Sequence, residues 1–560
     1  MEVRNGQKWR KPMKLRNITA LALTGTLVCS PSMYSFAEET KEITDTVMDS
    51  INEPDTNVTV TGLTFAGISV TGSDQTVIVK DVSNTGSNAL GKIGISAEDH
   101  ASVTANSVTV SNGTVGNVMG IKASDSAITV TGNTDAASDR ATAYGIYASK
   151  KSEVTVTGEI TVNAVKSAIG ATTSEESDVD LRTGNIKVTS AGSAIGLGGA
   201  LCDVNASTGD IAVDGDSAAY GIIFNNYENT QTVNVDGSIR VTGTEEADGI
   251  YVSGIGNGTT MVTATGDLTA ANGIRVAGAT GKDTIAVEGT INTDKSTLAV
   301  SVNSFNDLDT AAVYEALPEI YANTIRKNDG NYMILEASGD KEVVEGSKVA
   351  AANADYSSLE DQYMAEKVYY IVSRSTDGNG TVTVLGTENR TVNGKEYVVA
   401  QEMDTLTITF SPAFGYEIDG AKIAAGTGYT LTRNSDGTCS VEVARGGGLD
   451  IIGAFKMIPD ADSSEDGSDN RDPASTVTKQ LTGNTGDPVF DGGWLCDPDG
   501  NWFLFDKAGT MLVGWQFVNG KWYYLNPDSS YGIYGACRLG GRTPDGYEVD
   551  ETGAWTGRKS

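Results

Sequence analysis

The feature that most constrains this fold is a phrase that repeats about every 26 residues between residues 56 and 303. Each unit contains an isoleucine next to a glycine, followed by alternating apolar and polar residues, and many units include Thr-Gly. The isoleucines are Ile68, Ile95, Ile121, Ile146, Ile169, Ile195, Ile222, Ile250 and Ile274. The adjacent glycine predicts a compact turn in each unit, and the alternation predicts about three short strands.

A unit with three short strands cannot bury their apolar faces by itself. Stacking places each valine or isoleucine above its counterpart in the next unit, so the apolar residues form one continuous core. The sequence therefore predicts an all-β protein whose largest part, residues 56–303, is a right-handed parallel β-helix (a solenoid) of about nine or ten coils. Repeated β-sandwich domains are the alternative, but a period of about 26 residues is too short for a sandwich domain.

The segments on either side of the repeat have other patterns. Residues 1–37 combine six basic side chains with an apolar run and the small residues Ser35 and Ala37, which predicts a signal peptide. Residues 38–55 are predicted to be an N-terminal linker. Residues 304–367 lose the repeat and contain two helix-like stretches. Because an open solenoid end exposes strand edges, this segment is predicted to be a cap or connector.

Three further regions follow. Residues 368–456 return to short strands and predict a small β-sandwich or grasp-like module. Its pieces TLTITFSPAFGYEIDG and GLDIIGAFK resemble the internalin-type B repeat of Gram-positive surface proteins, although the tryptophan that usually follows the tyrosine is absent. The resemblance implies a spacer or adhesive module with Tyr416 in its core. Residues 457–488 predict an acidic disordered linker, and residues 489–560 predict stacked β-hairpin repeats.

The composition argues against several functions. The chain has 73 acidic and 40 basic residues, for a net charge of −33, and such a field repels nucleic acid. After the signal peptide no apolar stretch is long enough to span a bilayer, so we expect no membrane span. His100 is the only histidine, which excludes a zinc site with several histidines and removes the base of most hydrolytic mechanisms. We therefore expect no metal, no cofactor and no catalytic residues.

The style of the repeat resembles the β-solenoid passenger regions of bacterial surface adhesins and, more distantly, the pectin-lyase-like β-helix enzymes. A lyase of that kind needs a carboxylate cluster that binds calcium and a basic residue that abstracts a proton. Asp210, Asp214 and Asp216, with Arg240 one coil later, are the candidates for these roles. The sequence favours the simpler interpretation that these residues form a solvated acidic face.

The C-terminal segment concentrates the tryptophans. Beyond residue 37, all five lie between residues 494 and 555. A Gly-Trp pair at 493–494 recurs at 514–515, and a Gly-x-Trp triplet at 500–502 recurs at 520–522. Each unit predicts a small hairpin with a glycine at its turn. Hairpins of this size form no core of their own, so they must stack and bring their aromatic rings together.

These hairpins are closely similar to the choline-binding, or cell-wall-binding, repeats of Gram-positive surface proteins, above all in GWQFVNGKWYYLN at 514–526. The resemblance implies that rings of successive hairpins enclose a quaternary ammonium by cation–π attraction. The implied partner is the choline of cell-wall teichoic acid or another wall glycan. The candidate ligand-binding residues are Trp494, Trp502, Met511, Trp515, Trp522, Tyr523, Tyr547 and Trp555.

The C-terminal units also depart from the family pattern. The first has Phe503 and Leu504 where the pattern has two tyrosines, and the last lacks its Gly-Trp pair. We therefore expect one or two complete sites at most. Cys496 and Cys537 fall in the same small module and are the candidate pair for a disulfide.

Taken together, these features predict a secreted protein of the Gram-positive cell surface, held non-covalently on the cell wall by its C-terminal repeats. The solenoid is predicted to serve adhesion or glycan binding, with a host glycan or protein as its candidate partner. Two alternatives stay open: an enzyme that acts on polysaccharide along the β-helix flank, and a purely structural surface spacer.

Overall fold

The computed structural model describes residues 40–43 and 57–559 apart from internal gaps, the longest of which are 303–309, 346–355 and 458–492. The predicted signal peptide, most of the predicted N-terminal linker and nearly all of the predicted acidic linker lie outside the described residues. Within the described part, no helix is both long and apolar enough to cross a membrane.

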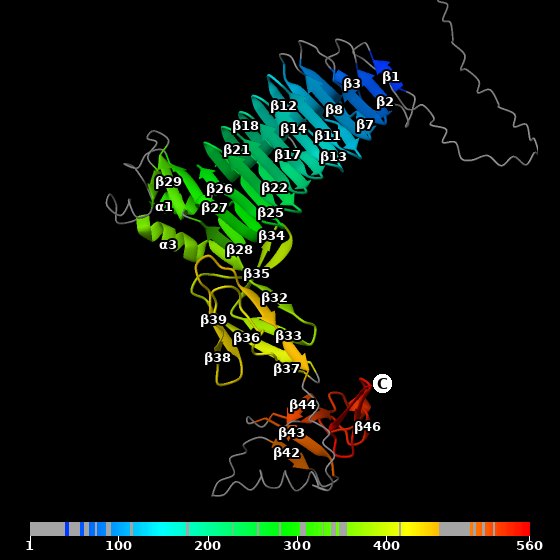
Figure 1. Cartoon of the computed structure of the whole chain (residues 1–560), viewed down its shortest axis with the longest axis vertical. Helices are drawn as coiled ribbons and strands as arrows, with labels where there is room; N and C mark the ends of the chain where they lie inside the picture. Colours follow the sequence, from blue (N-terminus) through cyan, green and yellow to red (C-terminus); the bar gives the residue numbers. More distant parts are fainter. Residues whose placement is uncertain are drawn as a thin grey trace, which may run out of the picture. The chain divides into compact units, whose positions relative to one another are not determined.

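The repeat folds as a parallel β-solenoid of about eight turns, with three strands in each turn (Figure 1). The first sheet contains β3 (Ala66–Thr71), β6 (Lys92–Glu98), β9 (Val118–Ser124), β12 (Thr142–Ser149), β15 (Ser167–Ser174), β18 (Ser193–Ala200), β21 (Ala218–Asn226) and β24 (Glu246–Gly254). The second contains β4 (Thr76–Ile78), β7 (Ser102–Ala105), β10 (Ala127–Val130), β13 (Ser152–Val156), β16 (Val179–Thr183), β19 (Val204–Thr208), β22 (Thr230–Val235) and β25 (Thr259–Ala264). The third contains β1 (Thr40–Ile43), β2 (Asn57–Val60), β5 (Asp81–Asn84), β8 (Ser107–Asn112), β11 (Thr134–Ser138), β14 (Ile160–Ala164), β17 (Ile186–Ser190), β20 (Ile211–Gly215) and β23 (Ile239–Gly243).

The prediction of an all-β protein with a parallel β-helix is therefore confirmed, and the number of turns is slightly lower than expected. The difference arises at the end of the repeat. There, β26 (Leu268–Ala277) and β27 (Thr284–Val302) each run through positions that separate strands occupy in earlier turns. Stacking continues beyond them into β28 (Glu319–Lys327) and β29 (Asn331–Ala337), but the division into three short strands is lost.

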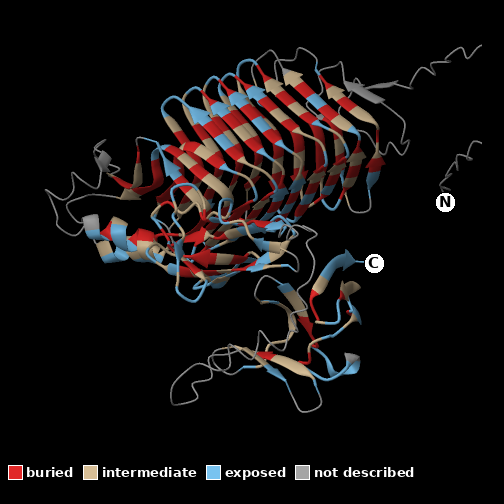
Figure 2. Ribbon diagram, turned by 60° about the horizontal axis from the view of Figure 1, so that its bottom comes forward, coloured by how far each residue is buried: buried red, intermediate tan, exposed pale blue. Residues whose placement is uncertain are grey.

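From β3 onward, the core of the solenoid consists of the inward-facing residues of its strands. In β13, for example, Ser152, Val154 and Val156 are buried and alternate with Glu153 and Thr155. Such alternation is the property that a period of two predicts for a strand with one buried face. The same banding of buried and exposed residues runs along the coloured strands of the solenoid in Figure 2. Each turn contributes one rung, so the core is continuous from turn to turn.

The glycine next to the repeated isoleucine does not lie at a turn, contrary to the sequence-based expectation. Gly145 lies in the middle of β12, and Gly221 lies in the middle of β21. A Cβ atom on Gly221 would lie 2.5 Å from the carbonyl oxygen of Gly249 and 2.6 Å from Cγ2 of Ile239. The backbone therefore approaches both the next rung and the opposite wall, and only glycine leaves enough space.

Glycine, rather than isoleucine, marks the equivalent position in each turn. The register pairs Tyr144 with Ile169 and pairs Ile146 with Ala171. Ile169 and Ile195 therefore face outward, whereas Ile146 and Ile222 are buried in the core. This explains why Ile169 and Ile195 precede the glycine in the sequence, while the other seven repeated isoleucines follow it.

Beyond the repeat, the chain forms two helices and a second group of strands. The helices are α1 (Thr310–Ala316) and α3 (Tyr356–Glu366), which coincide with the two helix-like stretches of the predicted cap. Between them lie β28, β29 and β30 (Val343–Glu345). Since β28 and β29 pair in parallel with β27, this segment extends the solenoid as well as covering its end.

Residues 368–457 form a second group of short strands, called the β module below. Its strands are β31 (Val368–Ile371), β32 (Ser373–Thr376), β33 (Gly380–Leu385), β34 (Glu388–Val392), β35 (Lys395–Ala400), β36 (Thr405–Pro412), β37 (Tyr416–Ile418), β38 (Thr432–Arg433), β39 (Cys439–Glu442), β40 (Asp450–Gly453) and β41 (Phe455–Met457). An antiparallel sheet in the order β33-β36-β39-β38 holds its core. Tyr416 is half-buried against that core.

This module is joined to the solenoid by more than the chain connection. β31 adds in parallel to β28, so it forms the last rung of the stack. The β34–β35 hairpin then contacts the solenoid: Lys395 Nζ lies 2.5 Å from Glu288 Oε1, and the hydroxyl of Tyr397 donates to the same carboxylate at 3.0 Å. A B-repeat-like spacer would be expected to move independently, but these contacts fix the module to the solenoid end.

We expect Tyr397→Phe to destabilise this junction. Tyr397 is buried, and its ring packs near Tyr321 with 6.4 Å between ring centroids. Phenylalanine keeps the ring but leaves Glu288 without the hydroxyl donor, a loss of about 1.5 kcal/mol. Thermal unfolding followed by circular dichroism should show a lower melting temperature, and an unchanged melting temperature would show that the bond contributes nothing to this junction.

Candidate functional site

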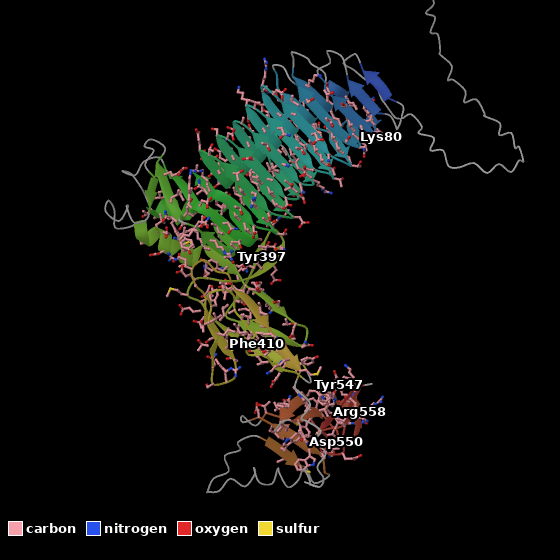
Figure 3. All side chains as sticks on the ribbon, in the orientation of Figure 1. Lys80, Tyr397, Phe410, Tyr547, Asp550 and Arg558 are labelled. Atoms are coloured by element: carbon pink, nitrogen blue, oxygen red, sulfur yellow. The ribbon has the colours of Figure 1, made fainter. Side chains whose placement is uncertain are left out.

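The C-terminal module consists of two hairpins followed by a small three-stranded sheet. The first hairpin pairs β42 (Gly493–Cys496) with β43 (Trp502–Phe505), and the second pairs β44 (Gly514–Val518) with β45 (Lys521–Leu525). After the 3-10 turn η1 (Ser529–Tyr531), the sheet contains β46 (Gly541–Arg542), β47 (Tyr547–Val549) and β48 (Trp555–Lys559). Figure 3 labels Tyr547 in β47, Arg558 in β48 and Asp550 in the turn between these two strands.

The glycine of each Gly-Trp pair is required for its backbone conformation. Gly493 has φ 129° and Gly514 has φ 75°, both in the region that residues with a Cβ atom rarely adopt. Open space surrounds the position where a Cβ atom would lie on either glycine. The constraint is therefore conformational, in contrast to the steric constraint on the solenoid glycines. It fixes the direction in which Trp494 and Trp515 leave the start of each hairpin.

Inward-facing residues hold the hairpins together, and most of the other aromatic residues stay accessible. Leu504, Tyr524 and Leu525 are buried. The aromatic candidates from the sequence are all half-exposed, which leaves part of each ring available to a ligand: Trp494, Trp502, Trp515, Trp522, Tyr523, Tyr547 and Trp555.

The first Gly-Trp tryptophan contacts the second hairpin. The rings of Trp494 and Tyr523 meet edge to face, with 5.0 Å between their centroids and an interplanar angle of 73°. The two rings therefore form a corner between successive hairpins. Burial raises the pKa of Tyr523, so its hydroxyl stays protonated and neutral at physiological pH.

The second Gly-Trp tryptophan repeats this arrangement one unit later. Trp515 meets Tyr547 of the following sheet edge to face at 5.6 Å, and it also meets Tyr524 of its own hairpin at 5.1 Å. Tyr547 in turn lies 6.3 Å from Trp555. The indole Nε1 of Trp515 donates to Asp545 Oδ2 at 2.7 Å, which orients the ring. The rings of Trp515, Tyr547 and Trp555 thus form a second corner between successive units.

A cation already lies at this second corner. The ammonium of Lys559 is 4.2 Å from the centroid of the Tyr547 ring, a distance typical of a cation–π contact. It also donates to the hydroxyl of Tyr547 at 2.9 Å, and this bond raises the pKa of Lys559. The corner therefore has the geometry and electrostatics to hold a positive charge.

Comparison with known protein families identifies the two hairpins as repeats of a known kind. Residues 492–511 and 513–528 each match the family model described as a putative cell wall binding repeat. The two hairpins carry cell wall binding repeats. Among curated proteins, none matches this chain.

The structure brings together some of the predicted ligand residues of these repeats and separates others. Trp494 and Tyr523 form one corner, and Trp515, Tyr547 and Trp555 form the second. Trp522 instead packs against Phe517 of its own hairpin, with 5.2 Å between centroids. Trp502 pairs in register with Cys496, and its carbonyl accepts a hydrogen bond from the backbone N–H of Cys537.

Met511 lies at the boundary between the first repeat and the second. Its backbone forms an isolated antiparallel β-bridge with Phe505. Its side chain lies close to Gly535, where an added Cβ atom would be 2.8 Å from Met511 Cε. Gly535 has φ 76°, so the turn that approaches Met511 depends on glycine for both conformation and space. Met511 thus packs beneath this turn, and its half-exposed side chain can still form part of a wall.

Three functional contacts of the repeats were missed by the sequence reasoning. Tyr524, the third aromatic residue of the Trp-Tyr-Tyr run, is buried and is the cross-strand partner of Trp515, and the pairing of a short hairpin could have indicated this. Asp545 follows a proline at a turn, which is a common loop pattern and carried no signal for an indole partner. Lys559 is one residue from the end of the chain and has no motif around it.

The candidate disulfide is not formed in the structure, where Cys496 and Cys537 are thiols. Both residues neighbour Trp502, one as its register partner and the other through the hydrogen bond to its carbonyl. Burial raises the pKa of the Cys537 thiol to about 12, so the reactive thiolate is scarce at neutral pH.

Two of the lyase candidates on the solenoid, Asp210 and Asp214, form hydrogen bonds to the next turn. Asp210 Oδ1 accepts a hydrogen bond from the backbone N–H of Ser238 at 2.7 Å, and Asp214 Oδ1 accepts one from the hydroxyl of Thr242 at 2.8 Å. Both carboxylates thus join successive turns. Arg240 is exposed and pairs in register with Ala212. Across the described ranges, no group of three or more histidine, cysteine or acidic residues is placed to hold a metal ion.

His100 is a surface residue close to an acidic group. Its Nδ1 lies 3.5 Å from Asp125 Oδ2, and its side chain is 72% exposed. The loop that carries it has positive φ angles at Asp99 and His100, which turns the chain from the first sheet of the solenoid into the second.

Proposed function

We propose that this protein attaches non-covalently to the choline-bearing teichoic acids of a Gram-positive cell wall through residues 489–560, after export. The recurring aromatic corner carries the proposal: Trp494 with Tyr523, then Trp515 with Tyr547 and Trp555. A trimethylammonium group carries a diffuse positive charge on an apolar surface, which suits the negative faces of several aromatic rings. The Lys559 ammonium supports the assignment, because it lies 4.2 Å from the centroid of the Tyr547 ring.

The proposal also assigns a role to the solenoid. Its core is a continuous stack, its end is covered by the cap and the β module, and its outer carboxylates take part in bonds between turns. We propose that the solenoid is a rigid, non-catalytic element for adhesion. Two candidate acids of the lyase alternative, Asp210 and Asp214, are engaged in bonds to the next turn, and the proposal assigns no cleavage reaction to this face.

Intrinsic tryptophan fluorescence tests choline binding directly. Apart from Trp9, every tryptophan lies between residues 494 and 555, so the emission reports on this module. We expect the tryptophan emission to change as choline is added and to reach a plateau at high choline concentration. The uncharged isostere 3,3-dimethyl-1-butanol should bind far more weakly, because it lacks the charge. Equal binding of both compounds would contradict a cation-selective cage, and no response to choline would contradict the proposed ligand.

We expect Lys559→Ala to strengthen choline binding at the second corner. The Lys559 ammonium lies over the Tyr547 ring and competes with a ligand cation for it. Removing this contact should lower the dissociation constant roughly two- to fivefold. The fluorescence titration measures the change, with Arg542→Ala, an exposed residue of the same sheet, as the control. Weaker binding by the Lys559 variant would mean that the lysine stabilises the site instead.

A further inference from the structure

The three faces of the solenoid differ in chemistry. Outward positions of the second sheet are mainly polar, as at Thr129, Thr155 and Arg182, which stack in register. Outward positions of the third sheet are also mainly polar, as at Thr161 and Lys187. The first sheet is the exception, because large apolar and aromatic side chains occupy its outward positions over several successive turns.

We define this surface as the tyrosine face, made by Tyr144, Tyr147, Ile169, Ile195, Tyr220 and Tyr251. Tyr144, Ile169, Ile195 and Tyr220 stack in one column, and Tyr147 and Tyr251 belong to the neighbouring column. All six side chains are half-exposed. An apolar stripe of this kind on an acidic protein is a mark of an interaction surface.

The rings at the two ends of the face are held in place. At one end, Tyr144 and Tyr147 meet edge to face at 6.1 Å, and the hydroxyl of Tyr147 is 2.7 Å from Ser174 Oγ. At the other end, Tyr220 and Tyr251 stack at 5.8 Å, and the hydroxyl of Tyr220 donates to Glu246 at 2.7 Å. Rings fixed in advance lose little conformational entropy when a ligand binds.

In the column that contains Tyr147 and Tyr251, the side chains between these two tyrosines are smaller than the tyrosine rings. The register places Thr172, Gly198 and Ile223 at the intervening positions. Gly198 has no side chain, and a Cβ atom there would lie 3.3 Å from Cγ2 of Ile223 and 3.4 Å from Cγ2 of Ile195. The face therefore has aromatic residues at both ends and a lower apolar floor between them.

The charges near the face disfavour an anionic ligand. Arg275, beside Tyr251, is buried and lies 2.6 Å from the carboxylate of Asp248, which has no exposed side-chain surface. Glu246 and Glu336 also pair with this arginine. The guanidinium is thus already neutralised, and the whole chain carries a net charge of −33. The same charge opposes close pairing of two copies through this face.

We propose that the tyrosine face binds an extended neutral glycan that lies along the solenoid axis. Adjacent rungs are about 4.8 Å apart, so Tyr144 and Tyr220 are roughly 14 Å apart along the axis. One sugar unit of an extended chain is about as long as the spacing between adjacent rungs, so each successive sugar lies beside the next turn of the solenoid. The apolar faces of the sugar rings stack on tyrosine, and their hydroxyls bond to Glu246 and Thr172. This inference rests on the proposed adhesive role of the solenoid.

Isothermal titration calorimetry of the purified protein with cellohexaose and chitohexaose tests this inference, with oligogalacturonate as the anionic comparison. We expect at least one neutral hexasaccharide to bind and oligogalacturonate not to bind. Tyr220→Ala/Tyr251→Ala should weaken the binding about tenfold, and Tyr144→Ala/Tyr147→Ala should also weaken it. The matched control is Thr155→Ala/Thr161→Ala on the two polar faces, which should bind like the unmodified protein.

Three outcomes would overturn the inference: neither neutral hexasaccharide binds, both tyrosine variants bind as well as the control, or the protein forms a dimer that the tyrosine variants disrupt. Circular dichroism of each variant establishes that the solenoid is folded. The tryptophan emission should respond to choline in every variant but not to the hexasaccharides. A failure of the glycan inference is thus distinguishable from a failure of wall attachment.

Discussion

Replacing Gly221 by alanine should destabilise the solenoid by about 3 kcal/mol. The added Cβ atom would lie 2.5 Å from the carbonyl oxygen of Gly249, 2.6 Å from Cγ2 of Ile239 and 3.0 Å from Cγ2 of Val241. The first neighbour is backbone held in the parallel stack, so it cannot turn away as a flexible side chain would. The overlap must instead displace a strand from its register with the next turn.

Thermal unfolding followed by circular dichroism measures this effect, and we expect the melting temperature to fall by roughly 6–10 °C. Gly198→Ala is the matched control, because Gly198 lies in the same sheet but its Cβ atom would face outward with no contact closer than 3.3 Å. The control should unfold close to the temperature of the unmodified protein. If both variants unfold at the same temperature, close approach is not the reason for the glycine column.

Replacing Trp515 by alanine should weaken choline binding about tenfold or more and remove most of the wall binding. Trp515 contacts Tyr547 and Tyr524, and its indole N–H binds Asp545. Alanine removes one ring of the second corner and a contact between the second hairpin and the following sheet. Each cation–π partner of a desolvated ammonium contributes about 1–2 kcal/mol, and the loss of a supporting ring adds to this.

Phe517→Ala serves as the control for Trp515→Ala. Phe517 is in the same hairpin, is 47% exposed and packs against Trp522 rather than against either corner. We expect this variant to bind choline and walls like the unmodified protein. If the two variants lose binding equally, the aromatic residues stabilise the hairpins and do not form a cage.

The sequence predicted the solenoid well because its signal is repeated. Alternation within each unit and a nearly constant period both follow from the stack, so one irregular turn does not hide the pattern. The role of the glycine was harder to predict. A glycine beside an isoleucine is compatible with a turn or with a close backbone approach, and only the register between Gly221 and Gly249 distinguishes them. For the same reason, the outward direction of Ile169 was not evident.

The aromatic site was predicted in part. Gly-Trp and Trp-Tyr-Tyr have distinctive spacing, so the hairpins and most of the rings were found. The partners of each ring were not predictable, because they depend on how successive hairpins stack. Trp522 and Tyr523 are neighbours in β45, yet Tyr523 meets Trp494 of the previous hairpin, whereas Trp522 packs on Phe517 of its own hairpin. Asp545 and Lys559 reach the site from a turn and from the last strand.

The most direct test of wall attachment is co-sedimentation of the purified protein with cell walls that contain choline. Walls that lack choline serve as the control, and the titration with free choline is done at fixed protein and wall concentrations. The account predicts that the protein sediments only with choline-bearing walls and that free choline returns it to the supernatant. Sedimentation that free choline does not reverse, or no sedimentation with these walls, would contradict it.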